Sequence, residues 1–298
     1  MLLAAVAVAG CGDSDKPDQR NASVVLDFVP NAVHAGIYRS IADGKYKEAG
    51  ITLAAREPGT TGQPVKLVQA GRATFGISDP IDVATAVQQG ARLQIIGALV
   101  QTPLGGVIAR SKVNSPAELE GKTVGETGVP SDQAVLDSIV TSAKADPDRV
   151  RTINVGFNGV QALKTGHVDA FVGFWPADGV EARVAGEHPK IFRLDANGGP
   201  SYPGLVLFTK TETVREDRQF VEKFVAATAA GYKATLSSPE QSLQASKQGF
   251  GSSSEPLAAA APKSRLDCVL RPDANSRRLD RPSRRKRNPS CLAQRRQR

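Results

Sequence analysis

Two stretches of the chain share one pattern, VKLVQAGRATFGI (residues 65–77) and VQALKTGHVDAFVGF (residues 160–174). Each reads as a helix, a glycine, one polar residue, a small apolar residue and then a strand. Gly71 and Gly166, which are 95 residues apart, are placed to end their helices in the left-handed conformation before the chain turns into a sheet. The repetition predicts two similar α/β lobes.

Short apolar runs alternate with helical patterns on both sides of these stretches, which is typical of a parallel sheet covered by helices. In the first lobe we expect strands at residues 23–29, 51–55, 73–78 and 93–101, and helices from residue 33 to Gly44, at 62–70 and at 80–89. In the second lobe we expect strands at 123–126, 150–155 and 168–174, and helices from Ser131 and at 158–165. A strand at 204–210 and an amphipathic helix at 217–236 are expected to return to the first lobe, so that two connections form a hinge.

The predicted fold class is therefore α/β, and the chain divides into five parts. These are a signal segment and tether (1–21), the first lobe (22–106), the second lobe (107–205), the return to the first lobe (206–250) and a disordered basic tail (251–298).

The net charge of +8 comes from the end of the chain, where residues 263–298 hold 13 Lys and Arg against 3 Asp. The other 262 residues sum to −2, so the body lacks the basic surface that nucleic-acid binding requires. No apolar run approaches the roughly 18 residues that a membrane-spanning helix needs. We therefore expect no nucleic-acid partner for the body.

The tail after residue 250 has no aromatic residue and cannot bury enough apolar surface to offset its ordering entropy. Two interpretations stay open. The tail is either a basic arm for nucleic acid or anionic lipid, or the product of a shifted reading frame that replaced the native C-terminal helices.

The first residues, MLLAAVAVAG (1–10), read as an apolar signal segment with small residues before Cys11. This pattern resembles a bacterial lipobox, which implies that Cys11 carries the lipid anchor and that the polar residues 12–21 form a tether. No Lys or Arg precedes the apolar run, and a frayed Ala-rich terminus is the alternative. Residues 12–267 contain no cysteine, so we predict neither a disulfide framework nor a metal site of cysteines.

Four stretches, two of which overlap the repeated pattern, follow one another along the chain: LDFVPNAVHAGIYRSIADGKYKEAGI (26–51), VKLVQAGRATFGISDP (65–80), LEGKTVGETG (119–128) and FNGVQALKTGHVDA (157–170). In this order they resemble ABC-transporter solute-binding proteins of the nitrate, sulfonate and thiamine-precursor superfamily, which includes the thiamine pyrimidine synthases. The resemblance covers about residues 23–245. It implies a type II periplasmic-binding fold that closes two lobes around a small ligand. LDFVPN resembles the branch that binds a pyrimidine precursor of thiamine.

In the first lobe, Asp27 and Phe28 end the first expected strand, at the edge where open α/β sheets place ligands. The carboxylate can accept hydrogen bonds from an aminopyrimidine while the ring covers its face, a contact worth about 1–3 kcal/mol. In the alternative reading, Phe28 belongs to the core and Asp27 caps a turn. The remaining candidates of this segment are Asn31, His34 and Tyr38.

The third expected strand is followed by Ser78, Asp79 and Asp82, although Asp79 also suits the N-cap of a helix that begins with Pro80 and stops at Gly90. In the second lobe, Gly125, Glu126, Thr127 and Gly128 match a loop that holds a phosphate in the synthase relatives, and this loop precedes a helix start that favours anions. Trp175, the only tryptophan, is a candidate stacking wall, with a core role as the alternative. Tyr202 is a candidate for closing the cleft.

The synthase relatives use a lysine-bound pyridoxal phosphate, a histidine four residues later and a cysteine-rich iron site. Here the corresponding positions hold Ser78, Asp82 and the segment ANGGPSYPG (196–204), so no Schiff base or iron site is predicted. We therefore expect no cofactor and no catalysis. The expected function is an extracytoplasmic lipoprotein that captures an aminopyrimidine-like solute for an ABC permease. A synthase-like enzyme and a sulfonate or nitrate binder are the alternatives.

Overall fold

The two glycines of the repeated pattern both adopt the left-handed conformation in the computed structural model, with φ of 70° at Gly71 and 78° at Gly166. At each, the chain leaves a helix, α3 (Gln63–Gln69) or α6 (Gly159–Thr165), and enters a strand, β3 (Phe75–Ser78) or β8 (Ala170–Phe174). The amide of the following residue donates back to the last helical turn, from Arg72 to Leu67 and from His167 to Ala162. The prediction that glycine ends both helices is confirmed.

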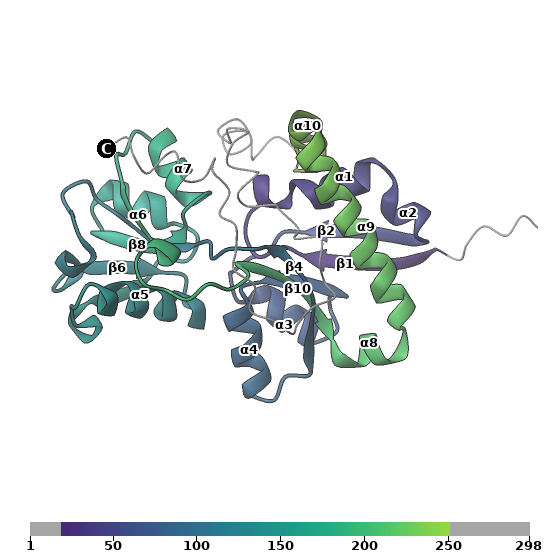
Figure 1. The fold of residues 1–298 in the computed structure, drawn as a ribbon, viewed down its shortest axis with the longest axis horizontal. Coiled ribbons are helices and arrows are strands. Elements are labelled where there is room, and N and C mark those ends of the chain that lie inside the picture. Colours follow the sequence, from purple (N-terminus) through teal and green to yellow (C-terminus); the bar gives the residue numbers. More distant parts are fainter. Residues whose placement is uncertain (1–18, 251–298) are drawn as a thin grey trace, which may run out of the picture.

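The structure describes residues 19–250, whose strands form two five-stranded sheets (Figure 1). The first has the order β2-β1-β3-β10-β4 and the second the order β7-β6-β8-β5-β9. β3 and β8 hold the same place in their sheets, so the lobes repeat one topology. The predicted α/β class with two lobes is confirmed.

The elements of the first lobe before the crossing are β1 (Arg20–Val25), η1 (Ala32–His34), α1 (Ala35–Ala42), α2 (Lys45–Glu48), β2 (Ile51–Arg56), α3, β3, α4 (Pro80–Gln88) and β4 (Leu93–Val100). The second lobe contains β5 (Gly105–Ala109), η2 (Pro116–Leu119), β6 (Thr123–Glu126), α5 (Pro130–Ser142), η3 (Pro147–Arg149), β7 (Arg151–Asn154), α6, β8, α7 (Asp178–Val184), β9 (Lys190–Arg193) and η4 (Leu194–Ala196). The chain then returns through β10 (Leu205–Lys210), α8 (Thr211–Glu216), α9 (Arg218–Ser237) and α10 (Pro239–Phe250).

The expectation of parallel sheets holds only in part, because both sheets are mixed. β10 runs antiparallel to β3 and β4, and β5 runs antiparallel to β8 and β9. These are the two strands that follow the connections between the lobes, so each enters its sheet in the reverse direction. The first strand was also expected to reach residue 29, but β1 ends at Val25, and Asp27 and Phe28 lie beyond the sheet.

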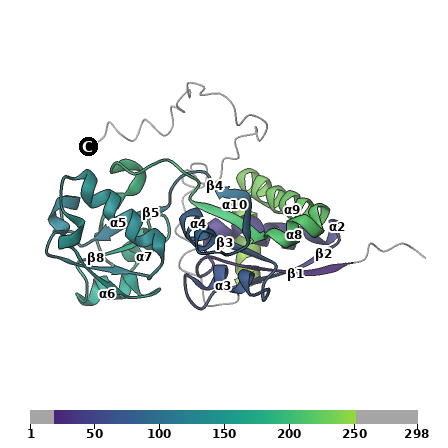
Figure 2. The ribbon, with the colours of Figure 1, turned by 90° about the horizontal axis from the view of Figure 1, so that it is seen from below.

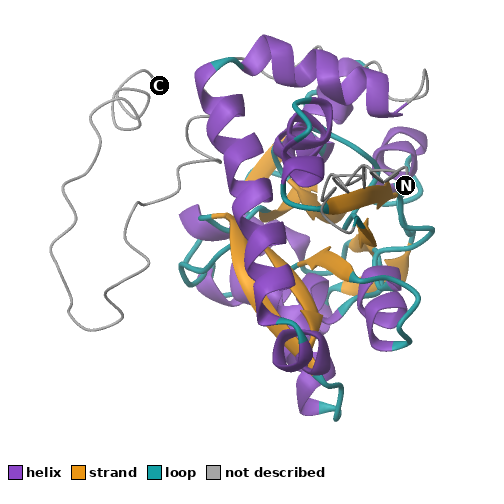
Figure 3. Cartoon of the chain, turned by 90° about the vertical axis from the view of Figure 1, so that its right-hand side faces the viewer, coloured by secondary structure: helices purple, strands orange, loops and turns teal. Residues whose placement is uncertain are grey.

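Helices cover both faces of the first sheet, as the view turned by 90° shows (Figure 2), and the end-on view shows its strands enclosed by helices (Figure 3). Within residues 19–250, the structure contains no helix with the length and apolar character needed to span a membrane. The tail and the residues around Cys11 lie outside the described part of the chain.

The long helix α9 packs closely on α1 because small residues face each other. Gly231 of α9 lies against the backbone of Gly36 and the side chain of Ser40, whose hydroxyl donates to the carbonyl of Ala227 at 2.7 Å. A methyl group at Gly231 would overlap the carbonyl oxygen of Gly36, so this helix pair depends on the absence of a Cβ.

Gly231→Ala should lower the free energy of unfolding by about 2 kcal/mol or more, because the added methyl group forces the helices apart. Helix propensity alone predicts the opposite sign, a gain of about 1 kcal/mol. The exposed Ala229→Gly is the matched control and should cost about 1 kcal/mol. Urea unfolding followed by circular dichroism measures both, and a more stable Gly231→Ala protein would refute the close packing.

Candidate functional site

Asp27 lies just beyond the carboxyl end of β1, and its carboxylate is buried, with 5% of the residue exposed. Nε2 of His34 lies 2.8 Å from its Oδ1. The amide of Asn31 donates to Nδ1 of the same imidazole at 3.1 Å, so the ring proton is on Nε2 and is donated to Asp27. The histidine is fully buried and fixes the orientation of the carboxylate.

The turn that carries His34 is held from both sides. Asn31 caps η1, since its Oδ1 accepts from the amide of Val33 at 2.9 Å and its side-chain amide donates to the carbonyl of Val29 at 3.1 Å. From α9, the hydroxyl of Tyr232 donates to the carbonyl of Val33 at 2.8 Å. The position of Asp27 is therefore set by the turn of residues 29–34 and by Tyr232 of α9.

Three buried side-chain atoms have no hydrogen-bond partner among residues 19–250: Oδ2 of Asp27, Oγ1 of Thr61 and Nε1 of Trp175. A buried polar atom left without a partner costs about 1–3 kcal/mol, so such atoms are rare and indicate a missing group. The set contains an acceptor, a hydroxyl and a donor. These atoms are suited to bind a small polar molecule.

Each of the three residues that carry these atoms is adjacent in the chain to a residue that contacts the opposite lobe. Phe28, next to Asp27, packs edge-on against Phe157 with ring centroids 4.6 Å apart. Gly62, next to Thr61, is close enough to Val129 that a methyl group on it would lie 3.7 Å away. Phe174, next to Trp175, packs against the core of the first lobe. We refer to this boundary, marked by Phe28, Gly62, Val129, Phe157 and Phe174, as the interlobe seam.

Trp175 follows β8 at the connection between the lobes. Its amide donates to the carbonyl of Leu104, and the guanidinium of Arg193 lies over its ring at 4.1 Å from the centroid. A cation on one face of the indole leaves the ring edge with Nε1 for another partner. Trp175 is thus a fixed side chain with an unused donor.

Ser78 and Asp79 both lie at the seam end of β3 and are buried. Asp79 caps α4, with its Oδ1 accepting from the amide of Ile81 at 2.8 Å, so the structural alternative for this residue is confirmed. Its Oδ2 lies 3.5 Å from the hydroxyl of Tyr202 on the second connection. Burial raises the pKa of Asp79 to about 7 and also raises the pKa of Tyr202.

Asp82 reaches from α4 to the second lobe. Its two carboxylate oxygens accept from the amide and the hydroxyl of Ser131, at 2.9 and 3.0 Å. In the neighbouring loop, the amide and hydroxyl of Thr127 both donate to Asp132 at 2.6 Å. The donors that were expected to meet a phosphate are therefore bonded to carboxylates of the chain itself.

The remaining candidates are Tyr38 in the first lobe and Gly125, Glu126 and Gly128 in the second. Tyr38 is in the core of the first lobe, and burial, with a smaller contribution from Glu57, raises its pKa to about 12. Gly125 is inside β6, where a methyl group would overlap Val155. Glu126 is partly buried, which raises its pKa, and Gly128 has a φ of 87°. The structure thus brings Asp27, Phe28, His34, Asn31, Asp79, Asp82 and Tyr202 to one side of the first lobe and leaves Tyr38 in its core.

Four residues at or near the seam were missed by the sequence analysis: Thr61, Phe157, Asp132 and Asp178. Phe157 stands in the family-like stretch 157–170, which could have singled it out. The others carry no local signal, because their roles depend on contacts made in the folded chain. Asp178 accepts from the amide of Phe174 at 2.6 Å and thereby fixes the end of β8 just before Trp175.

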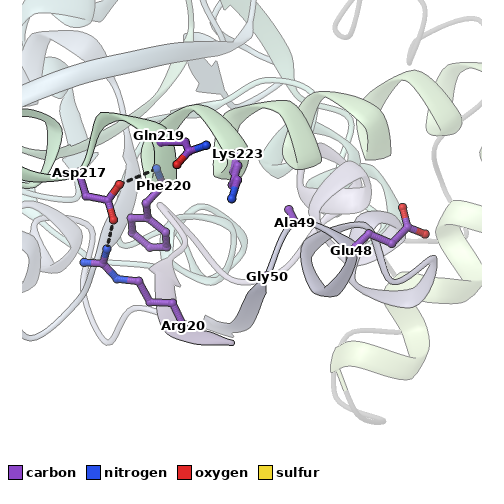
Figure 4. A pocket seen from close by; sticks show the side chains of 8 residues that line it. All are labelled: Arg20, Glu48, Ala49, Gly50, Asp217, Gln219, Phe220 and Lys223. Carbon is purple, nitrogen blue, oxygen red and sulfur yellow. Dashed lines mark hydrogen bonds and ion pairs between the residues drawn. The ribbon is translucent and has the colours of Figure 1, made fainter. Parts of the chain in front are cut away.

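A pocket of about 290 Å³ lies at the opposite end of β1 from Asp27 (Figure 4). Arg20 pairs there with Asp217 and its guanidinium stacks on the ring of Phe220. This pocket is at the amino end of the first strand, whereas open α/β sheets bind ligands beyond the carboxyl ends. Its lining is Arg20, Glu48, Ala49, Gly50, Asp217, Gln219, Phe220 and Lys223.

No group of three or more His, Cys, Asp or Glu side chains within residues 19–250 is arranged to hold a metal ion.

Comparison with known proteins supports the resemblance seen in the sequence. The model of the family described as NMT1/THI5 like matches residues 31–242. A formylaminopyrimidine-binding protein of Halalkalibacterium halodurans is 28% identical over 82% of this chain and 76% of its own length. A 4-amino-5-hydroxymethyl-2-methylpyrimidine phosphate synthase of Legionella pneumophila is 26% identical over 74% of this chain and 71% of its own. Among solved structures, the periplasmic aliphatic sulphonate binding protein SsuA of Escherichia coli has a TM-score of 0.66 at 16% identity, covering 84% of this chain and 83% of that one.

Asp178→Asn should change how stability depends on pH. Burial raises the pKa of Asp178 to about 7, whereas the unfolded chain has the ordinary value near 3.8. The folded protein therefore binds this proton more tightly than the unfolded chain does. The contribution of Asp178 to the free energy of unfolding is complete near pH 4 and is lost as the pH rises towards 7. Above pH 7 this contribution no longer changes. Between pH 4 and pH 8, the free energy of unfolding of the variant should therefore rise relative to that of the parent by about 4 kcal/mol.

Chemical unfolding at a series of pH values measures this difference. Asp148→Asn, at an exposed position, is the control for the loss of a carboxylate. A difference in the free energy of unfolding between Asp178→Asn and the parent that does not change with pH would contradict the prediction.

Proposed function

This chain belongs to the NMT1/THI5-like family, and we propose that it is the extracytoplasmic solute-binding lipoprotein of an ABC importer, with an aminopyrimidine-like ring as its ligand. The ligand lies at the interlobe seam, and closure of the lobes around it is the state that the permease recognises. The name of the relative from Halalkalibacterium halodurans, a formylaminopyrimidine-binding protein, supports this class of ligand.

The observation that carries the proposal is the unpartnered Oδ2 of Asp27. The other oxygen is occupied by His34, so the free oxygen is oriented and buried but unused. An amino group or ring N–H of a heteroaromatic ligand supplies the donor that this acceptor needs. A simple anion such as nitrate or a sulfonate offers no donor at this position, which disfavours the alternative binder.

Aromatic side chains at the seam suit a flat ligand. Phe28 and Phe157 meet there from opposite lobes, and Trp175 carries a buried Nε1 donor without a partner. One ring stacked on an aromatic side chain contributes about 1–3 kcal/mol, and one charge-assisted hydrogen bond a similar amount. Together these contacts are enough to select a small ring over water.

The residues of the chain fit a binder better than the synthase alternative. The last residue of β3 is the buried Ser78, which has no amine for a Schiff base, and Asp82 is bonded to Ser131 across the seam. The segment 196–204 contains no thiolate or imidazole for iron. These residues do not fit the cofactor and metal of the synthases, so we assign no catalytic step.

The lipid anchor at Cys11 rests on the sequence pattern of residues 1–10, which lie outside the described residues. Expression of the full chain in a bacterium followed by mass spectrometry should find acylated Cys11 as the first residue. An intact Met1 terminus would argue against both the anchor and the proposed location.

Addition of 4-amino-5-hydroxymethyl-2-methylpyrimidine to the purified full chain should change the fluorescence of Trp175, which is the only tryptophan. Asp27→Asn should weaken this binding by at least about tenfold, because a charge-assisted hydrogen bond is lost. Asp43→Asn removes a carboxylate that pairs with Arg39 on the surface and should leave the affinity unchanged.

Riboflavin and an alkanesulfonate are titrated in parallel as the competing ligand classes. A response to the sulfonate alone would overturn the proposed ligand. So would an Asp27→Asn protein that binds the pyrimidine as tightly as the parent does. A flat titration with all three compounds would overturn the proposed function.

A further inference from the structure

One carboxylate of the first lobe occupies the start of a helix in the second. Asp82, on α4, accepts from both the amide and the hydroxyl of Ser131, in the first turn of α5. Both residues are buried, at 9% and 7% exposure. The free amides and the dipole at the start of a helix attract anions, and here the anion is supplied by the opposite lobe.

The amides around this helix start are all accounted for. Those of Thr127, Gly128 and Val129 donate to the carboxylate of Asp132. Pro130 has no N–H group, the amide of Ser131 is bonded to Asp82, and that of Asp132 donates to the carbonyl of Val129. With the lobes together, this helix start has no donor left for an anionic ligand.

The surroundings add a second barrier to anions, because they are acidic. Asp79 and Asp132 are close enough to Asp82 to interact with it, and Asp132 also acts on Glu126. Burial raises the pKa of Asp82 to about 6, so its carboxylate is charged above that pH. A phosphate or sulfonate group at this place would have to displace one carboxylate and lie beside others.

We propose that Asp82 is a specificity-determining residue that excludes anionic groups from the start of α5 and so restricts the site to neutral or cationic ligands. This inference rests on the proposed function and narrows it, because it separates this chain from a binder of phosphate esters or sulfonates. The exclusion acts when the lobes close, since Asp82 and Ser131 come from different lobes.

The test compares 4-amino-5-hydroxymethyl-2-methylpyrimidine with its phosphate ester at pH 8, using the full chain and calorimetry. The parent protein should prefer the unphosphorylated compound by at least about tenfold, the cost of one displaced charge-assisted hydrogen bond. Asp82→Ser should reduce this preference by at least about tenfold through tighter binding of the ester. Asp137→Ser is the control: it removes a carboxylate from α5 itself, away from the start of that helix, and should leave the preference unchanged.

Asp82→Asn is a second variant that keeps an acceptor for the amide of Ser131 without the charge, and circular dichroism checks that each variant folds. Equal affinity of the parent for both compounds, or an unchanged preference in folded Asp82→Ser and Asp82→Asn, would overturn the inference.

If neither pyrimidine binds the parent, the proposed function fails, and inorganic phosphate still tests the role of Asp82. The parent should show no binding of phosphate, and Asp82→Ser should gain it. Absence of any gain would overturn the role of Asp82 independently.

Discussion

The contact on which the site depends is the hydrogen bond from His34 to Asp27. A buried carboxylate is costly unless it is bonded, and here exactly one of its oxygens is satisfied by the protein. The imidazole can donate only because its other nitrogen accepts from the backbone of Asn31, which fixes the tautomer. Asn31 and Tyr232 hold that turn in place, so the free oxygen of Asp27 is oriented before any ligand arrives.

The duplicated topology explains where this oxygen is directed. Each lobe ends its parallel strands at one edge, and the two connections bring these edges together, so that residues just past the strands meet across the seam. Phe28 meets Phe157, and Asp82 meets Ser131. The same geometry that buries Asp27 therefore also brings Asp82 of α4 to the helix start of the second lobe.

The repeated helix–glycine–strand pattern was sufficient to predict the two lobes, because a left-handed residue after a helix is a local requirement. The local signals also predicted the cap at Asp79, whereas Asp27, expected at the end of a strand, lies two residues beyond β1. The reversed directions of β5 and β10, and the contact between Phe28 and Phe157, could not be predicted, since they arise from connections and contacts between residues distant in the chain. For the loop 125–128 and the helix after it, the sequence indicated free donors. It contained no sign that Asp132 would accept from Thr127 or that Asp82 would reach Ser131 from the other lobe.

The most direct measurement is a crystal structure of the full chain with 4-amino-5-hydroxymethyl-2-methylpyrimidine. The account predicts the ring at the interlobe seam, with an N–H group of the ligand within hydrogen-bond distance of Oδ2 of Asp27 and His34 still bonded to Oδ1. A ligand bound at the pocket around Arg20 and Phe220, or an Asp27 whose free oxygen is paired with the protein itself, would contradict it.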